Sequence, residues 1–177
     1  LRVRVGNILS VSKEKVMLCF SHGHSSPNES ASPEYFEFVC HQVTVAVGSA
    51  LEHMTPVNAA WGNARVEIGL NRRKDCEAID RRGGILKICD AVSGSLKLIL
   101  LRLTAHGNVL KSDNYLISPD YFGAIRDMLS TEYGCPVMVT QGAAGNIAPR
   151  YFKSELNPPD ACDERFIRSE SALEDMA

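Results

Sequence analysis

The chain has 177 residues, of which 45% are hydrophobic and 23% are charged, and its formal net charge is -2 at pH 7. This length suits one domain with a substantial core, and the nearly balanced charge gives no reason to expect a nucleic-acid or anionic-membrane partner. No apolar run approaches the ~18 residues that a membrane-spanning helix needs, so we expect no transmembrane segment.

The first part of the chain predicts a strand, a long helix and a second strand. Residues 16–20 (VMLCF) are short, apolar and β-leaning, which is typical of a buried strand. Ser32 and Pro33 supply an N-cap and a first-turn proline, and apolar residues then recur at helical spacing to about Met54. Residues 64–70 (ARVEIGL) alternate as a half-buried strand should, and the basic segment NRRKD follows.

The second part predicts three strands and another helix. Residues 84–89 and 96–104 carry the strongest strand signals, and the turn DAVSGS between them favours a hairpin. The segment ISPDY opens a helix from about Pro119 to Tyr133, which Gly134 ends. Residues 136–141 (PVMVTQ) form a further buried strand that leads into the loop GAAGNIAPR. Helices alternating with strands predict an α/β fold, with a mixed sheet flanked by helices and functional loops at strand ends.

We expect one α/β domain over residues 1–152. Residues 153–177 are polar and are interpreted as a tail or a continuation of that domain, with a weak helical signal near residues 164–176. The six cysteines are scattered without a C-x-x-C pair, and Cys19, Cys89 and Cys135 lie in or beside apolar runs. This favours buried thiols over disulfides and a reducing compartment. Because the N-terminus also lacks the apolar core of a signal peptide, we expect a cytoplasmic protein.

Histidines stand directly after two of the predicted strands. In S-H-G-H, residues i and i+2 of an extended segment point to the same side, so His22 and His24 could face one site. Neutral imidazole is a common zinc ligand, and a neighbouring histidine could act as a general base, but a polar turn explains this spacing too. His106 follows the strand 96–104 and offers a second ligand. Catalytic zinc typically needs three protein ligands, and no residue at close spacing completes the set.

Two further segments could bind negative charge. The loop after the strand 136–141 exposes backbone N–H groups that could hold an oxyanion, although a tight turn is the simpler explanation. Arg72, in LNRRKD, could bind a carboxylate or a developing negative charge, with a solvated basic turn as the alternative. The loop residues concerned are Gly142, Ala143, Ala144, Gly145 and Asn146. Spacing alone therefore leads no further than a metallohydrolase hypothesis.

Six segments, taken in chain order, resemble the neutral/alkaline, non-lysosomal ceramidase family in the central part of its catalytic domain. They extend over roughly residues 1–151 and read VMLCFSHGHSSP, GLNRR, IDRRGGILKI, RLTAHGNVL, ISPDYFG and PVMVTQGAAGNIAPR. The resemblance implies a zinc-dependent amidase on an α/β domain, acting on a small-molecule or lipid-like amide.

The resemblance also implies roles for individual residues. It places zinc on His22 and His106, the general base on His24, and the arginine that holds the substrate or the oxyanion on Arg72. Zinc would polarise the amide carbonyl and acidify bound water, with His24 taking the proton. The family completes its zinc site with a glutamate and a tyrosine further downstream, so we expect a fragment of a longer domain. Ala148 stands where the family's glycine-rich loop carries a serine.

Three functional hypotheses stay open at this point. The first is a ceramidase-like hydrolase that cleaves an amide (C–N) bond, with ceramide or a smaller amide as substrate. The second is an esterase on the same scaffold. The third is a non-catalytic member that retains the fold, with or without the metal. None involves nucleic acid, and a homo-oligomer is compatible with all three.

Overall fold

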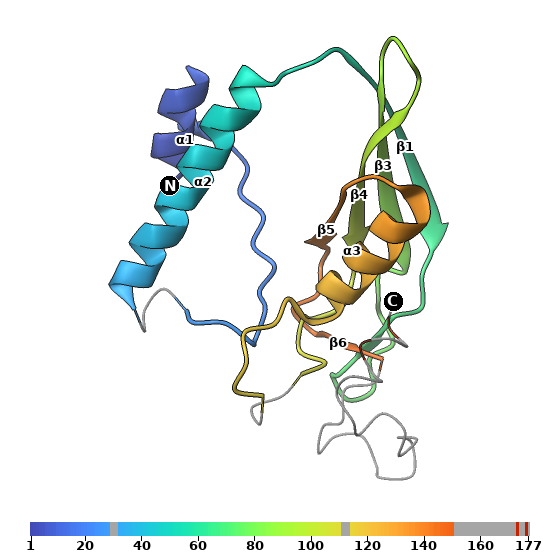
Figure 1. Ribbon diagram of the computed structural model, residues 1–177. Coiled ribbons are helices and arrows are strands. Elements are labelled where there is room, and N and C mark those ends of the chain that lie inside the picture. The colour runs from blue at the N-terminus through green and yellow to red at the C-terminus, as the bar shows by residue number, and fades with distance from the viewer. Residues whose placement is uncertain (29–31, 111–113, 151–172, 174–175, 177) are drawn as a thin grey trace. The chain divides into compact units, whose positions relative to one another are not determined.

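The computed structural model describes residues 1–28, 32–110, 114–150, 173 and 176, which divide into two compact units (Figure 1). One unit comprises residues 1–19 and 27–56, and the other comprises residues 20–26 and 57–177. Among the helices of the described ranges, none has the length and apolar character that crossing a bilayer requires. The expected helix over residues 164–176 and the expected boundary near residue 152 fall mostly outside the described residues, although residues 173 and 176 are helical.

The first unit consists of α1 (Arg2–Leu9), the short 3-10 helix η1 (Lys13–Lys15) and α2 (Pro33–Glu52). The prediction for α2 is confirmed: the Ser32 hydroxyl accepts a hydrogen bond from the backbone N–H of Tyr35 at 3.2 Å, and a proline occupies the first turn. Arg4 of α1 forms an ion pair with Glu37 of α2 at 2.8 Å, which links the two helices.

The prediction of a buried strand at residues 16–20 is wrong. No described strand pairs with this segment, and the side chains of Met17 and Phe20 are 85% and 67% exposed. Apolar, β-leaning residues favour an extended chain, but a strand also needs a neighbour with which to exchange backbone hydrogen bonds. Cys19 is correspondingly exposed rather than part of a core, whereas Cys135 is buried and Cys89 is partly buried.

The second unit has a mixed sheet, as predicted for an α/β fold. Its four strands lie in the order β1 (Val57–Arg65), β3 (Arg82–Asp90), β4 (Leu96–Leu103) and β5 (Val137–Gln141). β3 runs antiparallel to both β1 and β4 and forms the predicted hairpin with β4, and β5 runs parallel to β4. Helix α3 (Asp120–Tyr133) connects β4 to β5 and lies against the sheet (Figure 1).

A second, two-stranded sheet corrects two expectations. The strand expected at 64–70 is interrupted, because β1 ends at Arg65 and β2 (Gly69–Asn71) begins three residues after Val66. Val66 and Ile68 turn inward and pack against the core cluster under α3 instead of continuing the ladder. β2 pairs antiparallel with β6 (Ile147–Pro149), which lies in the segment expected to be a loop.

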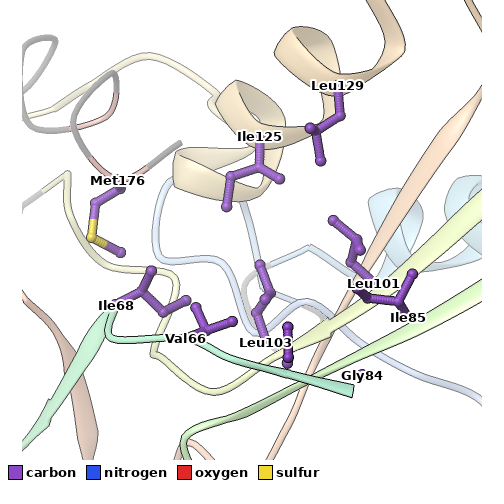
Figure 2. Close-up of a pocket in the computed structure, with 11 residues that line it drawn as sticks. Val66, Ile68, Gly84, Ile85, Leu101, Leu103, Ile125, Leu129 and Met176 are labelled. Atoms are coloured by element: carbon purple, nitrogen blue, oxygen red, sulfur yellow. The ribbon is translucent and has the colours of Figure 1, made fainter. Parts of the chain in front are cut away.

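The core of the second unit lies between α3 and the sheet. Ile125 and Leu129 of α3 point toward Leu101 and Leu103 of β4 across a small apolar cavity of about 180 Å³ (Figure 2). Because β4 and β5 are parallel, their carboxyl ends lie at the same end of the sheet. His106 follows β4 at this end, and the loop Gly142–Asn146 follows β5 there.

Candidate metal centre

The structure brings His22, His24 and His106 together within the second unit. One ligand nitrogen from each ring lies within 4.8 Å of the others, so the three could hold one metal ion. The ring centroids are 4.8 Å apart for His22 and His106, 5.3 Å for His22 and His24, and 5.4 Å for His24 and His106. Two segments separated by more than eighty residues therefore meet at one point.

The backbone conformation of the S-H-G-H segment differs from the extended one that the sequence predicts. His22 has a φ of 53°, in the left-handed region, so it is a turn rather than a strand end that aims the rings. The backbone N–H of His24 donates to the Gly107 carbonyl at 3.2 Å, and the next carbonyl, that of Ser25, accepts from Ser118 at 3.0 Å. Gly107 is needed at this contact, because an added Cβ would lie 2.7 Å from the Phe122 ring.

His106 is buried and held at both its backbone and its ring. Its N–H donates to the Ile147 carbonyl at 2.9 Å, and its Nδ1 lies 2.6 Å from the Ala144 carbonyl. A carbonyl oxygen only accepts hydrogen bonds, so Nδ1 carries the hydrogen and Nε2 keeps its lone pair. This is the tautomer in which metal-binding histidines are usually fixed by an outer hydrogen bond.

The environment of His24 favours its neutral form. Desolvation lowers the pKa of this imidazole, and the neighbouring His106, His22 and Arg72 lower it further, while the negative charge of Asp120 raises it. A neutral imidazole can bind a metal or accept a proton, and a protonated one can do neither.

Arg72 and the loop Gly142–Asn146 adjoin the histidines. The Arg72 guanidinium donates to the Gly145 carbonyl at 2.9 Å, and its backbone N–H donates to the Asn146 carbonyl at 3.0 Å. Within the loop, the N–H groups of Gly142 and Ala144 already donate to Leu103 and to Gly142 at 2.6 and 2.9 Å. The loop thus supplies a carbonyl that orients His106, a role that its glycine-rich composition did not suggest.

Sequence reasoning missed the part played by the start of α3. The sequence predicts only that the segment ISPDY, which contains Asp120, opens a helix near Pro119. The helix in fact begins with Pro119 at the N-cap and no side-chain cap, and Asp120 is 2% exposed with a φ of 55°. Its carboxylate accepts hydrogen bonds from the N–H groups of Val109 and Leu110. An acid placed directly after S-P was the available signal, but only the fold reveals its burial and its partners.

The donor set fits a divalent transition metal. Three imidazole nitrogens within reach of one point suit Zn²⁺, and they also suit Cu²⁺, Ni²⁺ and Fe²⁺. The hydrogen bond from His106 to Ala144 fixes one of these rings with its free nitrogen directed away from the carbonyl.

Comparison with known proteins places the fold. The structure is similar to that of the neutral ceramidase from Pseudomonas aeruginosa, with a TM-score of 0.73 and 20% sequence identity over 99% of this chain and 33% of that one. A ceramidase complexed with C2 matches with the same values. The chain therefore spans about a third of the length of these ceramidases. No family model and no curated protein matches the sequence. At this identity, the likeness shows a ceramidase-like fold.

Proposed function

We propose that the chain is the metal-binding part of a ceramidase-like, zinc-dependent hydrolase that cleaves an amide bond. The observation that carries the proposal is the convergence of His22, His24 and His106 on one point, with the His106 ring fixed in the tautomer that leaves Nε2 free. The ceramidase-like fold supports it, because the similar structures are those of ceramidases, enzymes named for their action on ceramide.

We assign the metal to His22 and His106 and the proton-accepting role to His24. When bound, zinc would polarise a carbonyl and acidify water, which is how such ions assist hydrolysis. His24 is kept neutral by its surroundings and can take a proton during attack on the carbonyl. Arg72 and the Gly142–Asn146 loop adjoin the histidines, and we assign them to the substrate and to the negative charge that develops on it. The N–H groups of Gly142 and Ala144 take no part in this, because they already donate within the protein.

Metal content tests the proposal directly. We expect about one zinc per chain in the wild type by elemental analysis, and its loss in the double variant His22→Ala/His106→Ala. The matched control, His41→Ala/His53→Ala, replaces the two histidines that lie outside the cluster, in α2 and at its C-cap. This control variant should retain the metal. Folded wild-type protein without zinc after zinc loading would refute the proposal.

The single variant His24→Ala then separates the two roles open to this residue. Zinc retained with loss of amide hydrolysis supports a proton acceptor, and zinc lost supports a third ligand. Hydrolysis is best measured on the longest natural chain, because these 177 residues span a third of the length of the similar ceramidases.

A non-catalytic, metal-binding member is the second candidate. The observation that favours it is Ala148, which replaces the family's serine and is 1% exposed in the pairing of β6 with β2. Stoichiometric zinc without turnover of amides or esters would support this candidate. Turnover of esters but not of amides would support the esterase alternative.

A further inference from the structure

We infer that Asp120 and Tyr121, the first two residues of α3, position His106 for metal binding by holding the chain on both sides of it. The inference rests on the proposed function, because it assigns these residues a part in a metal site. Neither side chain belongs to the histidine cluster itself.

After His106 in the chain, the Asp120 carboxylate holds the loop that follows β4. It accepts the backbone N–H of Val109 at 3.2 Å and that of Leu110 at 2.9 Å, one on each oxygen. A carboxylate that accepts several backbone N–H groups in a buried position fixes their geometry, since charged acceptors form the stronger hydrogen bonds. The residues three and four positions after His106 are therefore tied to α3.

Before His106 in the chain, Tyr121 holds Ala105. Its hydroxyl donates to the Ala105 carbonyl at 2.8 Å, and Gln141 of β5 donates to the same oxygen at 3.0 Å. Tyr121 and Ala105 are both 0% exposed, and burial raises the pKa of the phenol, so the hydroxyl stays protonated and remains a donor. Ala105 is thus fixed by both α3 and β5.

Ordinary helix capping does not explain Asp120. Only one of its accepted hydrogen bonds comes from α3, from the N–H of Tyr121 at 2.9 Å, whereas two come from the loop after β4. The residue also has a left-handed backbone, with a φ of 55°, and its own N–H donates to the Ser118 hydroxyl at 3.1 Å. Such a conformation is strained in a non-glycine residue and persists where the surroundings impose it.

The test compares zinc affinity among variants of the whole chain. Asp120→Asn keeps the size of the side chain and tolerates a left-handed backbone, but it removes the charge and one acceptor oxygen. Tyr121→Phe removes only the hydroxyl. The matched control is Asp90→Asn, because Asp90 also accepts two backbone N–H groups, those of Val92 and Ser93, in the turn between β3 and β4.

Zinc dissociation constants by chelator competition, and the visible spectrum of the Co²⁺-loaded protein, provide the readouts. We expect Asp120→Asn to weaken zinc binding by about 10–100-fold, as loss of an outer-shell partner typically does. Tyr121→Phe should weaken it by about threefold to tenfold, the effect of one buried hydrogen bond. Both variants should alter the Co²⁺ spectrum, and Asp90→Asn should change neither readout.

Variants that unfold at lower temperature, yet bind zinc within twofold of the wild type with an unchanged Co²⁺ spectrum, would overturn the inference and leave a purely structural role. If Asp120→Asn does not fold by circular dichroism, Tyr121→Phe decides alone. Amide hydrogen exchange of Val109 and Leu110 separates this inference from the proposed function. Faster exchange in Asp120→Asn than in Asp90→Asn shows that the carboxylate holds this loop, so that absence of zinc from the wild type would then refute the proposed function and not the hold. Equal exchange refutes the hold and with it the inference.

Discussion

Replacing Gly69 by alanine should destabilise the protein and disturb the histidine site together. A Cβ at this position would lie 2.5 Å from Ile147 Cγ2, 2.7 Å from the Thr104 carbonyl oxygen and 3.3 Å from the Ala148 carbonyl oxygen. Two of these neighbours are backbone atoms and the third belongs to a side chain that is 2% exposed, so none can move aside freely. Over-packing of this kind typically costs about 1–3 kcal/mol.

A loss of about 2 kcal/mol corresponds to a fall of about 4–8 °C in the melting temperature of a chain of this size. The effect should also reach His106, since Ile147 accepts its backbone N–H at 2.9 Å and Thr104 stands two residues before it. We therefore expect calorimetry to show the lower melting temperature, and chelator competition to show weaker zinc binding in the same variant.

Gly62→Ala is the matched control for this prediction. Gly62 lies in the exposed edge strand β1, and nothing lies within 4 Å of the position that its added Cβ would occupy. Alanine there should be neutral or stabilising by about 0.5–1 kcal/mol, because glycine weakens a strand. Equal melting temperatures for Gly69→Ala and Gly62→Ala would refute the close packing of β2 and β6 against the end of β4.

Three further predictions concern the fold. Asp80→Asn should lower the free energy of unfolding near neutral pH, because two arginines hold the pKa of this carboxyl well below its usual range. The difference in free energy of unfolding between wild type and variant should shrink as the pH falls below about 4, which unfolding at a series of pH values will measure. Ser32→Ala should cost about 1 kcal/mol and speed amide exchange in the first turn of α2. Leu103→Ala should cost about 2–5 kcal/mol in denaturant unfolding, because its side chain is 6% exposed, whereas Leu116→Ala at 77% exposure should cost almost nothing.

The parts of the fold that were predictable are those with local signals. Helix α2 has a capping residue and an apolar period, and β3, β4 and β5 are rich in β-branched and aliphatic residues. The edge strand β1 was missed because VNAAWGNAR carries no alternation and every residue in it is exposed. It exists because nine residues pair in continuous register with β3, and such pairing leaves no trace in a short window of sequence.

The candidate site was predictable in its residues but not in its construction. The H-x-H spacing indicated that His22 and His24 could share a site, yet the left-handed turn at His22 that produces this arrangement is not visible in the sequence. The approach of His106 depends on the Gly107 carbonyl meeting the His24 N–H, a contact between residues 83 positions apart. Sequence spacing predicts proximity only for residues that are close along the chain. The prediction that His106 lies near His22 and His24 therefore came from the resemblance to a family.

The three histidines are held to different degrees, and this difference has a consequence for metal binding. His106 is buried, with hydrogen bonds at its backbone and its ring, while His22 and His24 are exposed, and the N–H of His24 reaches a single carbonyl in the loop after β4. A ring that is already fixed loses little conformational freedom when it binds a metal, whereas exposed rings lose more. Changes around His106 should therefore reduce affinity by removing this preorganisation, and a metal bound to His22 and His106 should order the S-H-G-H segment. Slower amide exchange at His22 and His24 on zinc addition, with little change at His106, would be the expected sign, and uniform slowing at all three would contradict it.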